Sequence, residues 1–310
     1  INQDNNLSYC ETIAATNPCV TADTWVQTSE GPRQVAQLVG QPFVAMVHGK
    51  PHRTASEGFF ESGVKPVHLL RTREGYALKL TADHQVRRAG ALGDEWVAAS
   101  QLRPGDALLL NDHRGVDWRE SDIDRDDGAA IGSAIVELAR SSGLLGLVQP
   151  LVQPAMEAHS FACSAGLLQT VFSTDGWIDA SGPSIHLASN HRADLQTLQR
   201  MLLRLGIAST LVAETKASQL VVAGADTQRF LQCVGWVAEA ASPNLDALVA
   251  GAQAAAPRAR FTATFESLTR LADEPVYDVT VEDVHAFDAN GFMVKNCGEQ
   301  PLPPYGCCCL

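Results

Sequence analysis

The sequence has no long apolar run and no excess of positive charge. No segment approaches the run of about 18 apolar residues that a membrane-spanning helix requires, and the first residues lack the basic-then-apolar layout of a secretory signal. The formal net charge is -12 and aromatic residues make up only 6% of the chain. Since phosphate binding favours the opposite charge, nucleic-acid binding is not the expected main activity. We expect a soluble, cytoplasmic protein with no membrane partner.

The eight cysteines follow no regular spacing. A disulfide scaffold or a tetrahedral zinc site needs paired or repeated spacings, and three consecutive thiolates such as those at 307–309 cannot all point at one ion. We therefore predict neither a disulfide framework nor a metal site. Cys163 and Cys233 lie in apolar surroundings, which predicts small buried core residues.

Two segments of β-type sequence flank a middle segment of another kind. From 19 to 112, short runs that favour strands alternate with turn residues, and the same pattern of runs and turns occurs from 258 to 296. The DANG sequence at 288–291 predicts a hairpin turn. Between 113 and 257, apolar residues recur at three- and four-residue steps, which predicts helices. We expect one β body built from two chain segments with an inserted domain between them.

Several further segments are predicted to lack folded structure of their own. The acidic stretch 120–128 and the Ala-rich stretch 238–260 are expected to be linkers of the inserted domain. The polar residues 1–18 and the Pro-, Gly- and Cys-rich residues 297–310 could not fold alone. The chain begins at Ile1 rather than Met, so we expect a segment of a longer polypeptide.

Both edges of the predicted β body carry a thiol. Pro18 is followed by Cys19 at the first edge, and Asn296 is followed by Cys297 at the second. A cysteine can attack the carbonyl on its own amino side and convert the peptide to a thioester, whereas an asparagine can close on its own main-chain carbonyl and cut the chain. Either residue alone is uninformative. Together they would excise everything from Cys19 to Asn296.

Four sequence blocks at these positions resemble the splicing motifs of inteins, which are self-splicing proteins with the mostly β Hedgehog/intein (Hint) fold. CVTADTWVQTSEGPRQVAQL, starting at Cys19, is similar to the amino-terminal block. GYALKLTADHQV resembles the second block, with its T-x-x-H signature at Thr81 and His84. VYDVTVEDVHAFDANGFMVKNC is similar to the two carboxy-terminal blocks. The resemblance covers both flanking segments.

This resemblance implies a role for eight residues in splicing, without a cofactor, a metal or a partner. They are Cys19, the first nucleophile; Thr81 and His84, which hold the scissile peptide and donate to its nitrogen; Asp278, which manages the proton of the second nucleophile; His285 and Lys295, which flank the cyclisation; Asn296, which cyclises; and Cys297, the second nucleophile. Inteins usually carry histidine immediately before the terminal asparagine. Because a lysine is a weaker proton donor at neutral pH, Lys295 implies slow cyclisation or a greater reliance on His285, unless Lys295 is simply solvated.

The middle segment resembles a LAGLIDADG homing endonuclease domain. LQTVFSTDG at 168–176 is similar to the signature, and the sequence at 184–212 is similar to the strand and helix that follow it. The resemblance implies an inserted α+β domain with Asp175 as a vestigial metal-binding acid. Thr170 replaces the tight-packing glycine, no second acidic motif is found upstream, and 113–257 holds 9 basic and 15 acidic residues. We favour a degenerate, inactive remnant; DNA and a divalent metal are expected as ligands only if it is active.

The joined flanks resemble a different enzyme. NPCGEQPLPPYG, formed by joining Pro18 to Cys297, is similar to the active-site loop of the large chain of adenosylcobalamin-dependent (class II) ribonucleotide reductases. The resemblance implies that Cys297 becomes the thiyl radical after splicing, while Asn17 and Glu299 hold the nucleotide substrate. Adenosylcobalamin is then the cofactor of the spliced host.

These expectations divide the chain into five segments. They are a host fragment at 1–18, the first part of the Hint domain at 19–112, the degenerate endonuclease insert at 113–257, the second part of the Hint domain at 258–296 and the host active-site loop at 297–310. Two other functions stay open: a site-specific DNA endonuclease, and a reductase fragment with an inert insertion.

Overall fold

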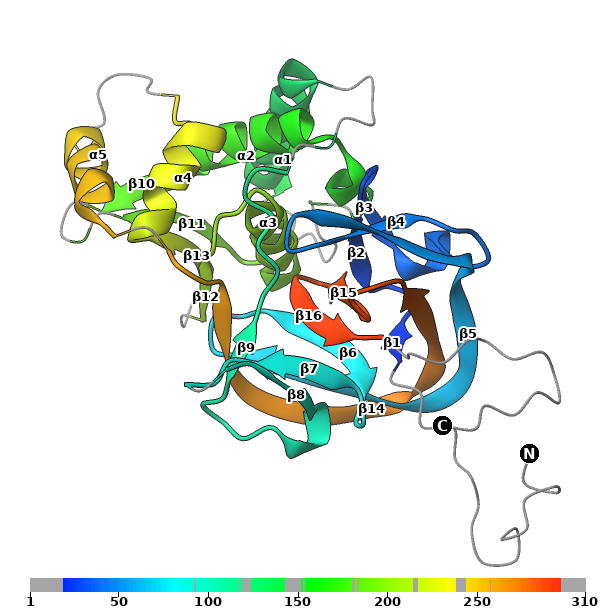
Figure 1. Cartoon of the computed structure of the whole chain (residues 1–310). Helices are drawn as coiled ribbons and strands as arrows, with labels where there is room; N and C mark the ends of the chain where they lie inside the picture. Colours follow the sequence, from blue (N-terminus) through cyan, green and yellow to red (C-terminus); the bar gives the residue numbers. More distant parts are fainter. Residues whose placement is uncertain are drawn as a thin grey trace, which may run out of the picture.

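Two long antiparallel strands, β5 (Lys50–Thr72) and β14 (Thr262–Val281), form the frame of the first domain. They come from opposite sides of the middle segment. Their pairing runs from Thr54 to Thr72 with four shifts of register, and such bulges bend a strand pair. In Figure 1 the two strands curve around the lower and right-hand parts of the molecule. This pairing joins the two β segments into one body, as predicted.

The computed structural model describes residues 19–91, 93–116, 118, 124–142, 152, 154–179, 182, 184–213, 217–237, 244–256 and 258–296. β5 and β14 belong to a 12-stranded sheet in the order β15-β16-β7-β9-β14-β1-β6-β5-β4-β2-β3, with β8 paired to β7. Its other strands are β1 (Val20–Thr21), β2 (Trp25–Thr28), β3 (Gly31–Gln34), β4 (Val44–Val47), β6 (Ala77–Thr81), β7 (Gln85–Arg88), β8 (Glu95–Ala98), β9 (Ala107–Leu109), β15 (Ala286–Ala289) and β16 (Phe292–Lys295). Short 3-10 turns lie at η1 (Val35–Gln37), η2 (Ala99–Gln101) and η3 (Pro154–Ala158).

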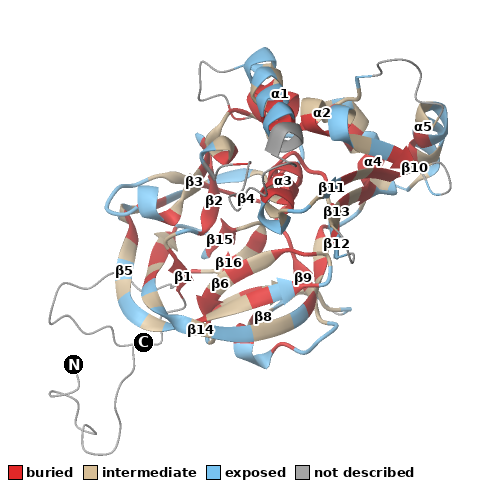
Figure 2. Ribbon diagram, turned by 180° about the vertical axis from the view of Figure 1, so that it is seen from behind, coloured by how far each residue is buried: buried red, intermediate tan, exposed pale blue. Residues whose placement is uncertain are grey.

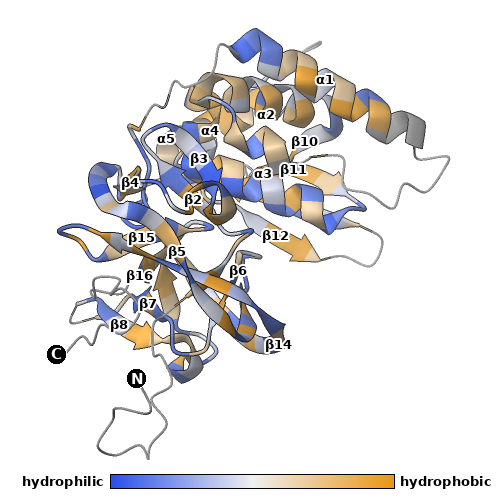
Figure 3. Cartoon of the chain, turned by 90° about the vertical axis from the view of Figure 1, so that its right-hand side faces the viewer, coloured by the Kyte–Doolittle hydropathy of each residue, from blue (hydrophilic) through white to orange (hydrophobic). Residues whose placement is uncertain are grey.

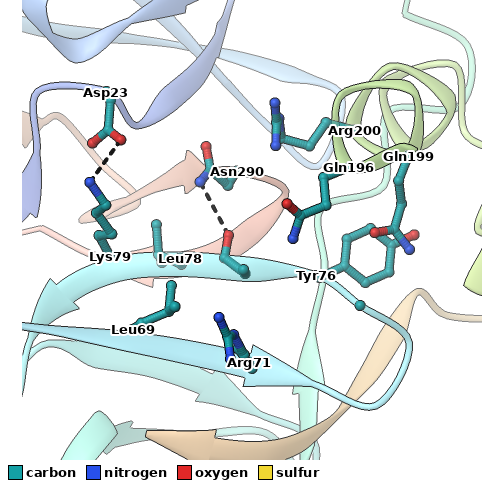
Figure 4. Close-up of a pocket in the computed structure, with 12 residues that line it drawn as sticks. Asp23, Leu69, Arg71, Tyr76, Leu78, Lys79, Gln196, Gln199, Arg200 and Asn290 are labelled. Atoms are coloured by element: carbon teal, nitrogen blue, oxygen red, sulfur yellow. Dashed lines mark hydrogen bonds and ion pairs between the residues drawn. The ribbon is translucent and has the colours of Figure 1, made fainter. Parts of the chain in front are cut away.

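The predicted hairpin turn is confirmed between β15 and β16. Asn290 and Gly291 both have positive φ, at 51° and 91°, as a tight hairpin turn requires. The Asn290 side chain accepts the Trp25 N–H at 2.8 Å and donates to the Ala77 carbonyl at 3.2 Å, the contact drawn in Figure 4. The turn therefore ties the last hairpin to β2 and β6, and Figure 2 shows the strands of this region mostly buried.

The middle segment forms the α+β domain that the sequence predicts. Its four-stranded antiparallel sheet has the order β10-β11-β13-β12. The strands are β10 (Gly176–Asp179), β11 (Ser184–Ser189), β12 (Thr210–Ala213) and β13 (Ser218–Ala223), and the helices are α1 (Arg125–Ser142), α2 (Phe161–Asp175), α3 (Arg192–Arg204), α4 (Ala225–Cys233) and α5 (Leu245–Ala254). α2 is largely apolar in Figure 3, and its Phe172 packs on Phe230 of α4 in a second core.

Parts of both expected linkers are helical, so that prediction is wrong for them. α1 begins at Arg125 because the Asp124 carboxylate accepts the N–H groups of Asp126 and Asp127, at 2.8 and 3.1 Å, and caps the helix. α5 lies within the Ala-rich stretch, where Leu248 and Ala252 are buried. A short apolar stripe in an alanine-rich run was enough to pack a helix.

The two cysteines predicted to be core residues differ. Cys163 on α2 is fully buried, which confirms the prediction. Cys233 is only half-buried, because it is the last residue of α4. Among the described residues, no helix is both long and apolar enough to cross a bilayer.

The inserted domain packs on the β body through α3 and β12. The Glu74 carbonyl, in the turn between β5 and β6, accepts the Leu211 N–H and the Gln199 side-chain N–H, both at 2.7 Å. Leu203 of α3 belongs to the core of the β body and lies against Gly291, where an added Cβ would come within 2.4 Å of it. Beside this contact is a cavity of about 240 Å³, part of whose wall is the Asp23–Lys79 ion pair (Figure 4). None of the predicted site residues lines it.

Candidate active site

Cys19 lies immediately before β1 and is fully buried. β1 is held between β6 and β14, and this pairing sets Cys19 beside Thr81, the last residue of β6. The Cys19 N–H donates to Thr81 Oγ1 at 3.1 Å, and the Thr81 N–H donates to the Cys19 carbonyl at 3.0 Å. The Cys19 nitrogen belongs to the peptide bond with residue 18. Thr81 therefore holds the nitrogen of the bond that is predicted to break.

His84 follows β6 in a tight turn and has no exposed surface. Its N–H donates to the Thr81 carbonyl at 3.1 Å, and its ring meets the edge of Phe287, with 6.3 Å between the ring centres. Burial lowers the pKa of His84 to about 4, against the smaller opposing effects of the Cys19 backbone and the Asp83 charge. The imidazole is thus neutral at neutral pH, and its protonated form is a strong acid placed next to the Cys19 backbone.

The Cys19 thiol lies in a mostly apolar site with charged groups at its edge. Val67 and Val276 pack with it. The pKa of Cys19 is raised to about 11, mainly by burial and to a smaller extent by the Asp278 charge, against the lowering effects of Ser62 and Lys65. Asp278 on β14 has no exposed surface, and its Oδ1 accepts the Val279 N–H at 2.8 Å. The thiol is thus protonated at neutral pH, and the predicted role as a nucleophile requires that its thiolate be created.

The carboxy-terminal junction is carried by the β15–β16 hairpin. Asn296 is 1% exposed, and its N–H donates to the His285 carbonyl at 3.1 Å across the open end of the hairpin. β16 also pairs with β7 at Val294 and Val86, two residues after His84. The hairpin therefore brings Asn296 to the strand that begins next to His84.

The side chains of His285 and Lys295 are less enclosed than their predicted roles suggest. His285 is exposed and has a positive φ of 47°, while Lys295 is half-buried at the end of β16. The backbone carbonyl of His285 is the group that accepts the Asn296 N–H. Of the other predicted residues, Asn17, Cys297 and Glu299 lie outside the described residues.

Two features of this region were missed by the sequence analysis. Lys65 Nζ lies 3.4 Å from Cys19 Sγ, although 46 positions separate the residues and no motif marks the lysine. His113 is buried with its Nε2 2.6 Å from Asp288 Oδ2, and Asp288 Oδ1 accepts the Gly291 N–H at 2.7 Å. Since both pairs depend on strands that meet only in the folded sheet, no local sequence signal could have revealed them.

The LAGLIDADG-like signature lies on α2, which packs against α1 at backbone distance. A Cβ added at Gly128 would lie 2.0 Å from the Cys163 carbonyl oxygen, and one added at Gly166 would lie 2.0 Å from that of Arg125. The two helices therefore pack closely even though Thr170 replaces the glycine of the signature. Glycines at other positions provide this close packing.

The helix crossing also reveals a second acid. Gly132 of α1 faces Thr170 of α2, since an added Cβ would lie 2.9 Å from the Thr170 side chain. Asp175 lies five residues after Thr170, and Glu137 lies five residues after Gly132. Both acids are exposed. The Glu137 position was missed because it is followed by leucine rather than glycine.

Comparison with known families identifies the middle segment. Residues 162–235 match the model of the LAGLIDADG-like domain. The inserted domain is LAGLIDADG-like. The match includes α2, the four-stranded sheet and α3, so the resemblance seen in the signature extends through the fold.

Curated relatives include the ribonucleoside-diphosphate reductase NrdEB subunit alpha of Bacillus subtilis and its counterpart in Bacillus phage SPbeta. Each is 26% identical over 161 residues, covering 44% of this chain and 15% of the relative. The chain thus spans a small part of the length of these relatives. These matches fit the ribonucleotide reductase context predicted from the joined flanks.

Similar solved structures are inteins. The Ssp DnaB mini-intein variant M86 has 12% identity and a TM-score of 0.40, with 92% of this chain and 98% of that chain covered. A DnaB intein from Synechocystis sp. PCC 6803 has 11% identity, a TM-score of 0.38 and coverage of 90% and 99%. The gp41-1 intein has 9% identity, a TM-score of 0.37 and coverage of 90% and 98%. The chain itself has the predicted arrangement of a mostly β body, built from two segments, with a LAGLIDADG-like α+β insert.

Proposed function

We propose that this chain excises residues 19–296 from a longer polypeptide and joins residues 18 and 297 by a peptide bond. One observation carries the proposal. The nitrogen of Cys19, which is the leaving group of the first step, is bound by Thr81 in a buried site that also contains His84. A structural cysteine in a core needs no such arrangement around its own peptide nitrogen.

In the first step, Cys19 sulfur attacks the carbonyl carbon of residue 18, and the bond from that carbon to the Cys19 nitrogen breaks. Thr81 orients the nitrogen through its 3.1 Å contact, and protonated His84 donates a proton to the departing amine. Because the pKa of His84 is about 4, little of the protonated form is present at neutral pH, but that form donates its proton readily. The proton lost by the sulfur equals the proton gained by the nitrogen, so the step needs no cofactor, metal or partner.

The later steps take place at the second junction. The Cys297 sulfur attacks the thioester at Cys19, so that the bond from the acyl carbon to the Cys19 sulfur breaks and a branched thioester forms on Cys297, with Asp278 accepting the thiol proton of Cys297. Asn296 then attacks its own carbonyl carbon with its side-chain nitrogen. The bond from that carbon to the Cys297 nitrogen breaks, which releases the two flanks joined by a thioester at Cys297. His285 and Lys295 are the proton donors that flank this cyclisation. A final shift of the acyl group from sulfur to nitrogen leaves an ordinary peptide bond.

The product of this reaction is the restored host loop. We propose that it belongs to a ribonucleotide reductase large chain of the adenosylcobalamin-dependent class, in which Cys297, Asn17 and Glu299 act on a nucleotide. The reductase relatives support a ribonucleotide reductase host, and the class is inferred from the NPCGE sequence alone. These three residues lie outside the part of the chain that the structure describes.

Intact mass measurement tests the splicing proposal. The chain is expressed between two reporter domains, alongside Cys19→Ala and Asn296→Ala controls. We expect a free species with the mass of residues 19–296 and a ligated reporter product, both lost in the controls. Unspliced precursor alone, with no cleavage at either junction, would contradict the proposal, and cleavage at one junction alone would indicate an impaired splicing element.

A second candidate function is DNA cleavage by the insert. Glu137 and Asp175 at equivalent positions of α1 and α2 favour it, because cleavage of two strands uses two acids. The negative charge of the insert opposes it. Two exposed carboxylates are a weak donor set for a divalent metal, and no cluster of three or more such ligands occurs among the described residues, so we derive no metal-dependent step. Incubation with the uninterrupted host DNA and Mg²⁺ distinguishes the candidates, with Asp175→Asn as the control for any cleavage.

A further inference from the structure

Lys65 on β5 is the cationic side chain that reaches the sulfur of Cys19. Its Nζ lies 3.4 Å from Cys19 Sγ and 3.1 Å from Ser62 Oγ. Lys65 is half-buried, and Cys19 is fully buried. An ammonium group in a partly desolvated site interacts with a thiolate more strongly than a fully solvated one does.

Two charged side chains, Lys65 and Asp278, act on the thiol, and His84 lies next to the Cys19 backbone; each comes from a different element. Lys65 is on β5, Asp278 is on β14 and His84 follows β6. His84 is neutral at neutral pH because its pKa is about 4, so Lys65 is the positive charge that acts on the thiol against Asp278. Without that positive charge, the thiolate would form in an apolar site beside a carboxylate.

We propose that Lys65 is a catalytic residue of thioester formation, whose ammonium group binds and stabilises the Cys19 thiolate. This inference rests on the proposed splicing function and adds a group that the intein resemblance did not supply. Lys65 keeps its protons throughout. The Cys19 S–H bond and the bond between residue 18 and the Cys19 nitrogen break, an S–C bond and an N–H bond form, and no other reactant is consumed.

The size of the effect follows from two opposing terms. A hydrogen bond to a charged group is worth roughly ten- to a hundredfold in the thiolate population. A stabilised thiolate is also a weaker nucleophile, which cancels about half of that gain on a logarithmic scale. Removal of the Lys65 charge should therefore slow thioester formation by roughly three- to tenfold.

The test isolates the first step in a chain that carries Asn296→Ala and Cys297→Ala, flanked by reporter domains. Dithiothreitol captures the thioester, and the rate of amino-terminal cleavage is measured between pH 7 and pH 9. We compare Lys65→Arg, Lys65→Met and Lys65→Glu, with Lys50→Met at the exposed start of the same strand as the matched control. The expected order of rates follows charge: Lys65 and Lys65→Arg are fastest, Lys65→Met is roughly three- to tenfold slower and Lys65→Glu is slowest.

A second measurement separates catalysis from folding. In a Cys19→Ala background, cleavage after Asn296 reports on the other junction, and it should be the same with Lys65 and with Lys65→Met. The proposal is overturned if Lys65→Met matches the parent at the first junction, if Lys65→Arg is as slow as Lys65→Met, or if both junctions slow equally. If the parent itself gives no thiol-dependent cleavage, the splicing function fails, and the role of Lys65 fails with it.

Discussion

Burial of His84 makes the folded chain sensitive to acid in a way that one substitution should remove. The pKa of His84 falls from an ordinary value of 6.5 to about 4 in the folded state, mainly because the ring is desolvated. The unfolded chain therefore binds a proton between these values when the folded chain does not. The stabilisation due to a neutral His84 is fully present above pH 6.5 and is lost progressively as the pH falls toward 4.

The difference of about 2.5 pKa units corresponds to about 3 kcal/mol of unfolding free energy. His84→Gln cannot titrate, so it should lack this loss. Other groups titrate in the same range, and the informative quantity is thus the difference in unfolding free energy between parent and variant. Between pH 7 and pH 4 that difference should shift by about 3 kcal/mol against the parent.

The assay is urea unfolding of a Cys19→Ala, Asn296→Ala chain that cannot splice, followed by tryptophan fluorescence. Trp25 and Trp118 are buried, so their emission reports on both domains. The control is the interval from pH 7 to pH 8, where the difference between parent and His84→Gln should stay constant. Parallel loss of stability in both proteins from pH 7 to pH 4 would refute the inference that His84 is held neutral by burial.

Three further predictions concern the junctions and the insert. Thr81→Val removes the acceptor of the Cys19 N–H, so thiol-dependent cleavage at the first junction should slow by roughly 10- to 100-fold. Thr81→Ser keeps the hydroxyl and should cleave at a rate close to that of the parent. Equal rates for the two variants would contradict the role of the hydroxyl. Lys295→His should accelerate cleavage after Asn296 in a Cys19→Ala background, and an unchanged rate would mean that proton donation there does not limit cyclisation. Gly166→Val places a side chain against the Arg125 carbonyl of α1, so it should destabilise the insert by about 3 kcal/mol in thermal unfolding. The control Gly182→Ala lies in open space and should not destabilise the insert. Similar melting temperatures for the two variants would disprove the close helix packing.

The local arrangement of Thr81 and His84 at the first junction was predictable because it depends on a short sequence block. The T-x-x-H spacing fits in one turn at the end of β6, where Thr81 and His84 are linked by a backbone hydrogen bond. The Asn-Gly pair likewise specified a hairpin turn through the conformations that its two residues favour. Such features depend on residues within a few positions of one another, so sequence reasoning reaches them directly.

The helices of the insert show where the same reasoning failed. Thr170 replaces the tight-packing glycine of the signature, and the sequence did not reveal that Gly128 and Gly166 provide the close approach from other turns of the two helices. The acidic and Ala-rich stretches were expected to be linkers, because composition does not reveal that Asp124 caps a helix or that Leu248 meets a core. These outcomes depend on partners that are distant in sequence.

The sequence by itself determined the two-segment β body, the α+β insert and the residues at each junction, since periodicity, turn chemistry and short motifs are local properties of the chain. Only the tertiary structure decided how deeply Cys19 is buried and which charged side chains lie near its thiol. Burial is the main reason that the pKa of the thiol is raised to about 11. The pairing of β1, β5 and β14 brings Lys65, which lowers this pKa, and Asp278, which raises it, close to the thiol. Desolvation and electrostatic interactions depend on which groups are neighbours in the folded protein. Strands that lie far apart in the sequence become neighbours only when the sheet forms.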